Sequence, residues 1–445
     1  MLLSPVKIFI SALLILTGVQ VTAQTSTSST TDNTSNPLNG RENDPYSKYG
    51  IGELVNPNNA VLRGMGNISS AFENPYEMNT ENPASYAFLA RTTFEMGATA
   101  SVRYIKGSGL SYTTGTSSLS YFTLGMPVGK NAGFCIGFKP ISHEYYSMVD
   151  TISTPQSPIG QVARSYSGEG GLNYAYLGGA WQYKGLSIGV NLGYVFGTIQ
   201  QITSTVPIDT NSINRAYTAD FANYNQIGGL YWKAGIMYER KLDSDYTFRL
   251  GGTFALTQNL TDRLNAFQIS IYNFGDTIVN DTSVNKGEQH GFLTMPMTYS
   301  IGAMLVKNDK WSIGADYSFT QWSGYKSTVD PTLNTGVGSQ AYKISLGGEF
   351  TPDINNIRNY WSRLTYRWGV YYGTDYLNID GTQLPNYGVT AGLSLPFRRS
   401  TSHMHMALDL GRLGTTTGSL IQQTYIRYTL GISFNDRWFV KRRYD

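Results

Sequence analysis

The chain has 445 residues and a net charge of only +3, and charged residues make up 14% of it against about 25% in ordinary soluble domains. Glycine and tyrosine are abundant, with 48 and 33 copies, whereas the single cysteine excludes an intramolecular disulfide framework. This balanced charge gives no reason to expect a nucleic acid as partner.

The first 23 residues have the organisation of a secretory signal peptide. Lys7 precedes an apolar run over residues 8–21, and Val21-Thr22-Ala23 forms a cleavage signal ahead of Gln24. The apolar run is too short for a membrane helix, and no later stretch supplies about 20 unbroken apolar residues. We therefore predict an exported protein without a helical membrane span.

Two further segments precede the main pattern. Residues 24–43 are a polar Ser, Thr and Asn sequence that cannot bury a core, so we expect a disordered lead-in. Residues 44–90 are rich in Asn, Pro and Gly without strand alternation, which predicts a compact irregular plug. Within it, Asn82-Pro83-Ala84 should form a rigid corner, because proline fixes its own φ and pushes the preceding residue to an extended conformation. Such a corner fits a gating hatch and an ordinary packed turn alike.

From residue 91 to residue 434, apolar and polar residues alternate in about fourteen segments. In residues 186–192, for example, Leu, Ile and Val alternate with Ser, Gly and Asn. This pattern predicts an all-β fold, a transmembrane antiparallel β-barrel of about 14 strands whose apolar face meets lipid. A soluble β-sandwich has the same period, but it hides its apolar faces and rarely runs to fourteen consecutive hairpins. On this assignment, arginine at Val190 or Leu346 should destabilise the barrel, and arginine at Asn191 should cost much less.

The connections between the predicted strands suggest an orientation. Short turns alternate with long connections at 146–170, 202–225 and 260–293, which we expect to be extracellular loops. An even strand count should return both termini to the periplasm, with residues 435–445 as a short tail. The predicted location is the outer membrane of a Gram-negative bacterium.

The segment before the barrel carries a family likeness. Arg63-Gly64-Met65-Gly66 is followed by a stretch from Met78 to Tyr86 that contains Asn82-Pro83-Ala84. This segment resembles the N-terminal hatch of the FadL-type transporters of long-chain fatty acids and other hydrophobic compounds, and the closing residues 431–439 resemble Bacteroidota members. The resemblance implies a monomeric barrel, plugged from the periplasmic side, that captures an apolar ligand outside and releases it laterally through a gap in the wall.

The expected loops 260–293 and 202–225 offer a candidate capture surface for such a ligand. The same side chains could equally pack the loops onto the barrel mouth. The candidate capture residues are Phe221, Leu264, Phe267, Ile271 and Phe274.

Catalytic and metal-binding patterns are weak. His403 and His405 share a strand face with Asp409, but two histidines without a neighbouring third ligand favour polar lumen residues over a metal site. No nucleophile and base pair or phosphate-binding loop stands out. We therefore expect no enzyme activity, no cofactor and no metal.

Two functions remain. The first is passive uptake of long-chain fatty acids or other hydrophobic compounds, with membrane lipid and an apolar small molecule as partners. The alternative is a non-transporting FadL-like barrel that acts as a structural or shuttle subunit of an envelope secretion or assembly machine, with envelope proteins as partners. A continuous apolar tunnel would favour the first, and a lumen filled by the plug and polar side chains would favour the second.

Overall fold

The computed structural model describes residues 43–438 except 108, 154–160, 208–217, 275–276, 309, 357, 399 and 419. The predicted signal peptide, nearly all of the lead-in and most of the C-terminal tail lie outside the described residues. No helix among the described residues is long and apolar enough to cross a membrane.

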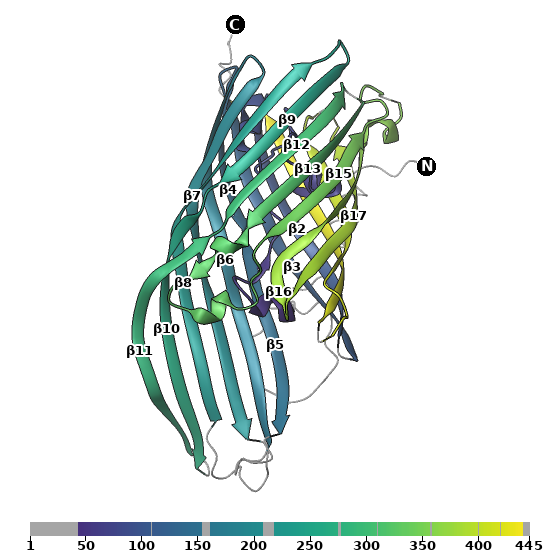
Figure 1. Ribbon diagram of the computed structural model, residues 1–445. Helices are drawn as coiled ribbons and strands as arrows, with labels where there is room; N and C mark the ends of the chain where they lie inside the picture. Colours follow the sequence, from purple (N-terminus) through teal and green to yellow (C-terminus); the bar gives the residue numbers. More distant parts are fainter. Residues whose placement is uncertain are drawn as a thin grey trace. The chain divides into compact units, whose positions relative to one another are not determined.

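The strands form one closed antiparallel sheet, a 14-strand barrel, as the sequence predicts (Figure 1). The ring closes where β2 (Thr92–Gly107) pairs with β19 (Gln422–Asp436), with Thr92 opposite Asp436. The other wall segments are β3 (Leu110–Val128), β4 (Ala132–Pro140), β5 (Ser142–Ser153), β6 (Gln161–Tyr183), β7 (Leu186–Pro207), β8 (Thr218–Lys241), β9 (Tyr246–Ala255), β10 (Gln258–Phe274), β11 (Thr277–Met295), β12 (Met297–Lys307), β13 (Trp311–Gln321), β14 (Lys326–Ser327), β15 (Ala341–Phe350), β16 (Thr365–Ile379), β17 (Thr382–Pro396) and β18 (His403–Leu413). Four pairs of consecutive segments, β4 with β5, β9 with β10, β11 with β12 and β13 with β14, each form one strand of the wall, which gives the 14 strands.

The two faces of the sheet separate as the alternation predicts. Val190 and Leu346 are exposed on the outer surface, whereas their neighbours Asn191 and Ser345 are buried on the lumen side. Apolar side chains in contact with lipid and polar ones in the lumen are the pattern of an outer-membrane barrel.

One part of the wall is much longer than a membrane crossing requires. β6, β7 and β8 have 23, 22 and 24 residues, whereas about 9 to 11 suffice to span the hydrocarbon core. With β5, β10 and β11 they form an extended wall that reaches toward the bottom of Figure 1. The expected loops 146–170, 202–225 and 260–293 are therefore wrong, because these segments are mostly hairpin strands. Strand pairing continues there without the strict apolar alternation that lipid contact imposes.

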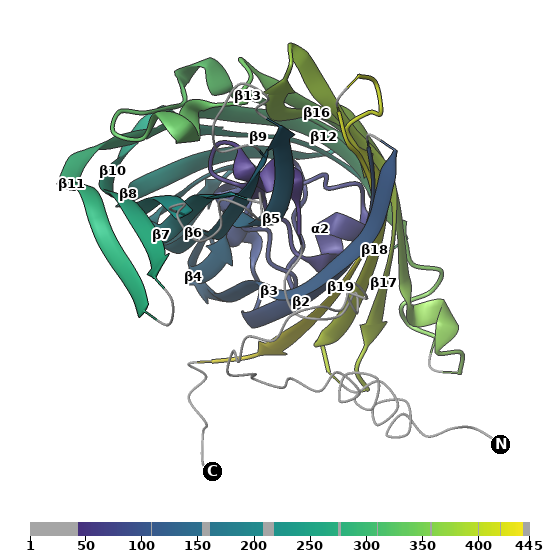
Figure 2. The same cartoon turned by 90° about the horizontal axis from the view of Figure 1, so that it is seen from below.

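The plug lies inside the ring of strands (Figure 2). It comprises η1 (Pro45–Lys48), β1 (Glu53–Leu54), α2 (Ala60–Gly64) and η2 (Pro83–Phe88). Asp44 contacts Gln423 at the start of β19, far along that strand from Asp436. β2 thus begins and β19 ends at one rim, whereas the chain enters the plug near the other rim.

Glycines of the wall allow the plug backbone to pack directly against the strands. A Cβ atom at Gly189 of β7 would lie 2.5 Å from the carbonyl carbon of Pro83, and one at Gly235 of β8 would lie 2.8 Å from its Cδ. No side chain fits at either position, so glycine is required for close backbone approach.

Three 3₁₀ turns complete the described structure. They are η3 (Trp322–Gly324) and η4 (Pro331–Asn334), which lie in the connection from β13 to β15, and η5 (Trp361–Arg363) before β16. The β13–β15 connection packs against the plug and the extended wall, since Asp330 accepts hydrogen bonds from Asn223 of β8.

Candidate functional site: the plugged lumen and the wall cleft

Every acidic residue of the plug is paired with a basic residue of the wall. The five carboxylates are spread along the plug from Asp44 to Glu81, and their partners come from strands all around the ring. The pairs are Asp44 and Glu53 with Arg103, Glu53 with Arg427, Glu73 with Arg249, Glu77 with Arg367, and Glu81 with Lys139 and Lys233.

Glu81 shows how these contacts hold the plug. Its Oε2 lies 2.8 Å from Lys233 Nζ, and its Oε1 binds Lys139 on the facing strand β4. Burial alone would raise the pKa of the Glu81 carboxyl, but the two ammonium groups outweigh burial and hold that pKa well below its usual range. The carboxylate therefore stays charged, and removal of one partner would leave buried charge uncompensated.

The predicted hatch motif is a fully buried corner. The Asn82 side chain caps η2, because Oδ1 accepts a hydrogen bond of 3.1 Å from the Ala84 N–H. Its Nδ2 donates to the Ser70 carbonyl within the plug and to the Ile236 carbonyl of β8, at 2.5 and 3.2 Å. Asn82-Pro83-Ala84 thus fixes the plug to the wall, and whether it also gates stays a prediction.

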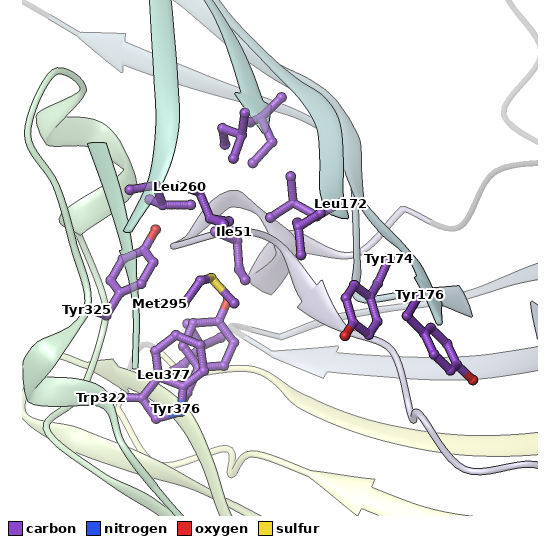
Figure 3. Close-up of a cluster of buried hydrophobic side chains, with 14 of the residues drawn as sticks. Ile51, Leu172, Tyr174, Tyr176, Leu260, Met295, Trp322, Tyr325, Tyr376 and Leu377 are labelled. Atoms are coloured by element: carbon purple, nitrogen blue, oxygen red, sulfur yellow. The ribbon is translucent and has the colours of Figure 1, made fainter. Parts of the chain in front are cut away.

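An apolar cluster lies between the plug and the residues that surround it (Figure 3). Ile51 of the plug packs there against wall residues, and Trp322 stacks on Tyr376 with ring centroids 4.3 Å apart. The Tyr376 hydroxyl donates to the carbonyls of Tyr49 and Gly52 in the plug. We call this cluster the apolar seal; its labelled members are Ile51, Leu172, Tyr174, Tyr176, Leu260, Met295, Trp322, Tyr325, Tyr376 and Leu377.

The candidate capture residues do not form one patch in the described structure. Leu264 is buried, Phe221 is 48% exposed, and Phe267 packs edge-on against Tyr224 at 6.0 Å. Since side chains alternate along a strand, Leu264 and Phe267 lie on opposite faces of β10. Ile271 and Phe274 also belong to β10, but their side chains lie outside the described residues. Ligand capture at these positions stays a prediction.

His405 and Asp409 have structural partners. His405 lies between the Ser394 and Ser433 hydroxyls, at 2.6 and 3.0 Å, while Asp409 accepts a hydrogen bond from Tyr371. Among the described residues, no group of three or more His, Cys, Asp or Glu could hold a metal ion.

The lumen holds a cavity with a mixed lining, in which apolar residues such as Leu54, Ile141 and Met295 lie beside charged ones. This cavity has a volume of about 390 Å³ and separates part of the plug from the wall. It is lined by Glu81 and by three lysines, Lys139, Lys233 and Lys343. Further charged lining residues are Asp375, Asp409 and Arg427, and the tyrosines are Tyr174, Tyr231, Tyr342, Tyr371 and Tyr425.

A second cavity, the wall cleft, lies between β3 and β5. β3 pairs with β4 only from Phe122 to Val128. Among the described strands, none pairs with the same edge of β3 over residues 110–121. Asn43 bridges the two sides, since its N–H donates to Thr114 Oγ1 at 3.0 Å and its Nδ2 donates to the Ser147 carbonyl at 2.9 Å. The cleft has a volume of about 670 Å³ and is lined by Asp44, Ser47, Glu53, Thr116, Ser118, His143, Glu144, Tyr145, Glu169, Gly170, Thr198, Ile199, Gln200, Tyr224, Asn225, Gln226 and Asn265.

Sequence reasoning missed the basic wall residues and the seating glycines. Lys139 and Arg367 occupy lumen positions of β4 and β16, and a charge at such a position signals a buried partner. The partner itself depends on where the plug lies, which strand alternation does not specify.

Comparisons with known proteins agree with this architecture. A protein-family model described as BamG matches residues 6–445. The chain has no match among curated proteins. Its fold is similar to that of a Pseudomonas aeruginosa FadL homologue, with a TM-score of 0.57, 12% identity and coverage of 87% of this chain and 99% of that one.

Two toluene transporters are also similar. The P. putida protein TodX gives a TM-score of 0.55 at 15% identity, and the Ralstonia pickettii protein TbuX gives 0.53 at 14% identity. Each comparison covers 85% of this chain and 98% of the other. The FadL-type resemblance is thus confirmed for the fold.

Proposed function

The chain belongs to the BamG family, and we propose that it is a closed outer-membrane barrel that serves as a structural subunit of an envelope secretion or assembly complex. The observation that supports this proposal is the charge pairing in the lumen. All five plug carboxylates are bound by wall cations, so displacement of the plug would leave several buried charges without partners.

The free space supports the same proposal. An apolar ligand gains about 0.8 kcal/mol per CH₂ group when it leaves water for an apolar site, but it gains nothing comparable against charged groups that must lose their own hydration. The lumen cavity contains lysines and carboxylates, and the wall cleft contains carboxylates and amides. Charged groups thus interrupt the lining of both cavities.

Planar-bilayer recording of the full-length protein tests the closed barrel. We expect no large, steady conductance from the wild type and large, steady channels from a variant that lacks residues 44–90, because 14 strands without a plug enclose an aqueous pore. Equal steady conductance of the two proteins would contradict a closed barrel.

Native electrophoresis of gently solubilised outer membranes tests the subunit role. We expect the protein to migrate in a complex with other envelope proteins, well above the mass of its own barrel. Migration as a single barrel at native abundance, under conditions that preserve a known outer-membrane complex, would contradict the subunit role.

Uptake of hydrophobic compounds is the second candidate, and the likeness to the FadL homologue and the two toluene transporters supports it. Long-chain fatty acids are the substrate that we propose for this candidate. The measurement is uptake of a radiolabelled long-chain fatty acid by cells with equal surface amounts of wild type or of the double variant Phe267→Asp, Phe274→Asp. Uptake above an empty-vector strain that the double variant loses would favour transport over the structural role.

A further inference from the structure

One connection at the rim of short turns is much longer than its neighbours. β2 begins and β19 ends at this rim, which we expect to face the periplasm, and four of its turns, 129–131, 184–185, 242–245 and 308–310, have only two to four residues. The connection from β15 to β16 instead runs over residues 351–364 and includes η5. Figure 2 shows it outside the ring of strands, next to β17. It therefore lies beside the wall and not over the lumen.

Hydrogen bonds within this connection give it a defined conformation. Asn356 Oδ1 accepts hydrogen bonds from the backbone N–H groups of Arg358 and Asn359, at 3.1 and 2.9 Å. The Asp353 N–H donates to the Ser362 carbonyl at 2.8 Å. Side-chain contacts to nearby backbone groups stabilise a turn without a hydrophobic core. The connection can therefore hold its outward side chains in fixed positions.

The connection exposes apolar side chains beside the lipid-facing surface. Ile354, Tyr360 and Trp361 are 49%, 41% and 67% exposed. Tyr366, which is exposed on the outer face of β16, donates a hydrogen bond of 3.2 Å from its hydroxyl to the Trp361 carbonyl. Tryptophan and tyrosine are enriched where a membrane meets water, because one end of each side chain is apolar and the other is polar. These side chains thus extend the lipid-facing surface to the depth of the lipid headgroups.

Two exposed arginines lie next to this surface. The Tyr360 hydroxyl donates to the Pro396 carbonyl at 3.2 Å, so the connection contacts the start of the turn 397–402. Arg358 lies two residues before Tyr360, and Arg398 lies two residues after Pro396. Both side chains are exposed, and neither forms an ion pair with any residue that the structure describes. Guanidinium groups bind phosphate oxygens through paired N–H donors.

The charge of this corner differs from that of the rest of the rim. Residues 351–364 and 397–402 together contain four arginines and one aspartate, in a chain whose net charge is only +3. Each of the other four turns contains at most one lysine and no arginine. Cations at headgroup depth attract anionic lipids. The combination of arginines with exposed aromatic side chains is therefore a local feature and not a general property of the rim.

We propose that the connection 351–364 and the turn 397–402 form a binding site for anionic phospholipids of the adjacent membrane leaflet. Arg358 and Arg398 bind the lipid phosphate, and Trp361 lies at the level of the headgroup. Lipid fits better than an acidic protein, because the exposed aromatic side chains join the lipid-facing surface directly. The site does not depend on a closed lumen, so its failure would leave the structural role proposed above untouched.

Fluorescence quenching of the full-length barrel in phosphatidylcholine nanodiscs tests this proposal. The probe is an environment-sensitive dye on Ile354→Cys, which reacts selectively because Cys135 is buried. The quencher is a nitroxide close to the headgroup, carried at equal mole fraction by either phosphatidylglycerol or phosphatidylcholine. We expect both lipids to quench the dye, and phosphatidylglycerol to quench it about two- to fivefold more strongly, because its net negative charge favours the arginines.

Two double variants test which cations are responsible. Arg358→Gln with Arg398→Gln should abolish the preference for phosphatidylglycerol. The matched control, Lys130→Gln with Lys241→Gln, removes two exposed cations elsewhere on the same rim and should retain the preference. A dye on Ser244→Cys, in the exposed turn 242–245, should be quenched less than a dye at residue 354.

Four results would overturn the proposal. They are equal quenching by the two lipids, a preference that survives the loss of both arginines, loss of the preference in the lysine control as well, and a dye at residue 354 that neither lipid quenches. Loss in both double variants would indicate a general attraction of the charged rim for anionic lipid. An unquenched dye would place the connection in water, where an acidic protein is the better partner.

Discussion

Asn191 lies on the lumen face of β7, where its side chain joins the plug to the wall. Its Oδ1 accepts a hydrogen bond from the Tyr86 hydroxyl at 3.0 Å, and its Nδ2 donates to the Thr80 carbonyl at 3.1 Å. These contacts should make arginine more costly there than strand alternation alone predicts. Strand alternation assigns a residue to a face, but it does not say whether water or the plug occupies the space beyond that face.

We expect arginine to destabilise the barrel at both neighbouring positions, for different reasons. Val190→Arg places a charge in lipid and should cost about 2 to 4 kcal/mol in the free energy of unfolding. Asn191→Ala removes two buried hydrogen bonds and should cost about 1 to 3 kcal/mol for each partner left unsatisfied. Asn191→Arg removes the same hydrogen bonds, and its larger side chain must also displace the plug. Urea unfolding in lipid vesicles measures these costs, and a wild-type midpoint for Asn191→Arg would contradict the contacts.

The Glu81 pairing gives a second prediction at this scale. Glu81→Ala leaves Lys139 and Lys233 buried without their carboxylate, so the plug should lose about 3 to 5 kcal/mol of stability. Because the folded-state pKa of Glu81 is lowered, the wild-type contribution is present above the usual carboxyl pKa and is lost as the pH falls through the lowered value.

Protease sensitivity of the plug measures this loss. Glu288→Ala serves as control, since its exposed contact with Arg263 at 3.8 Å should contribute no more than about 1 kcal/mol. A plug equally protected in wild type and Glu81→Ala would contradict the prediction.

At the scale of elements, the membrane part of each strand could be predicted and the extended wall could not. Lipid contact requires apolar residues at every second position, as in residues 186–196, and this alternation can be recognised in the amino-acid sequence. Beyond the membrane both faces can carry polar residues, so residues 161–170 of β6 have strand geometry without a strand-like sequence. The Pro, Gly and Asn content of residues 44–90 predicts an irregular segment, but it does not predict which wall residues that segment contacts.

The seating glycines give a prediction about the fit of plug and wall. Gly235→Val should push the plug away from β8, because even a Cβ there would overlap Pro83, and overpacking of this kind costs about 1 to 3 kcal/mol. Gly179→Val is the matched control, since a Cβ at Gly179 meets nothing within 4 Å. Protease cleavage within residues 44–90 should increase for Gly235→Val alone, and equal cleavage of the two variants would mean that the glycines do not seat the plug.

At the scale of the whole molecule, the plug is held by contacts distributed around the ring. The sequence predicts a plug before a barrel, yet the pairing of each plug carboxylate with a distant basic residue, such as Glu77 with Arg367 across 290 positions, follows only from the closed fold. The apolar seal adds buried apolar contacts to these ion pairs. Loss of one contact should therefore weaken the plug without releasing it.

Salt dependence distinguishes a plug held by buried ion pairs from a plug held by exposed ion pairs. Exposed ion pairs are screened at high ionic strength, where the Debye length falls to about 3 Å at 1 M, whereas buried pairs are screened much less. The Arg367 and Glu77 side chains are 2% and 4% exposed, so we expect the wild type to stay electrically silent in planar bilayers from about 0.1 M to about 1 M KCl. The double variant Glu77→Ala, Glu81→Ala should conduct at both concentrations, because two of the plug's anchors are gone. Channel opening of the wild type at high salt would show that the plug is held by exposed charges and not by the buried pairs.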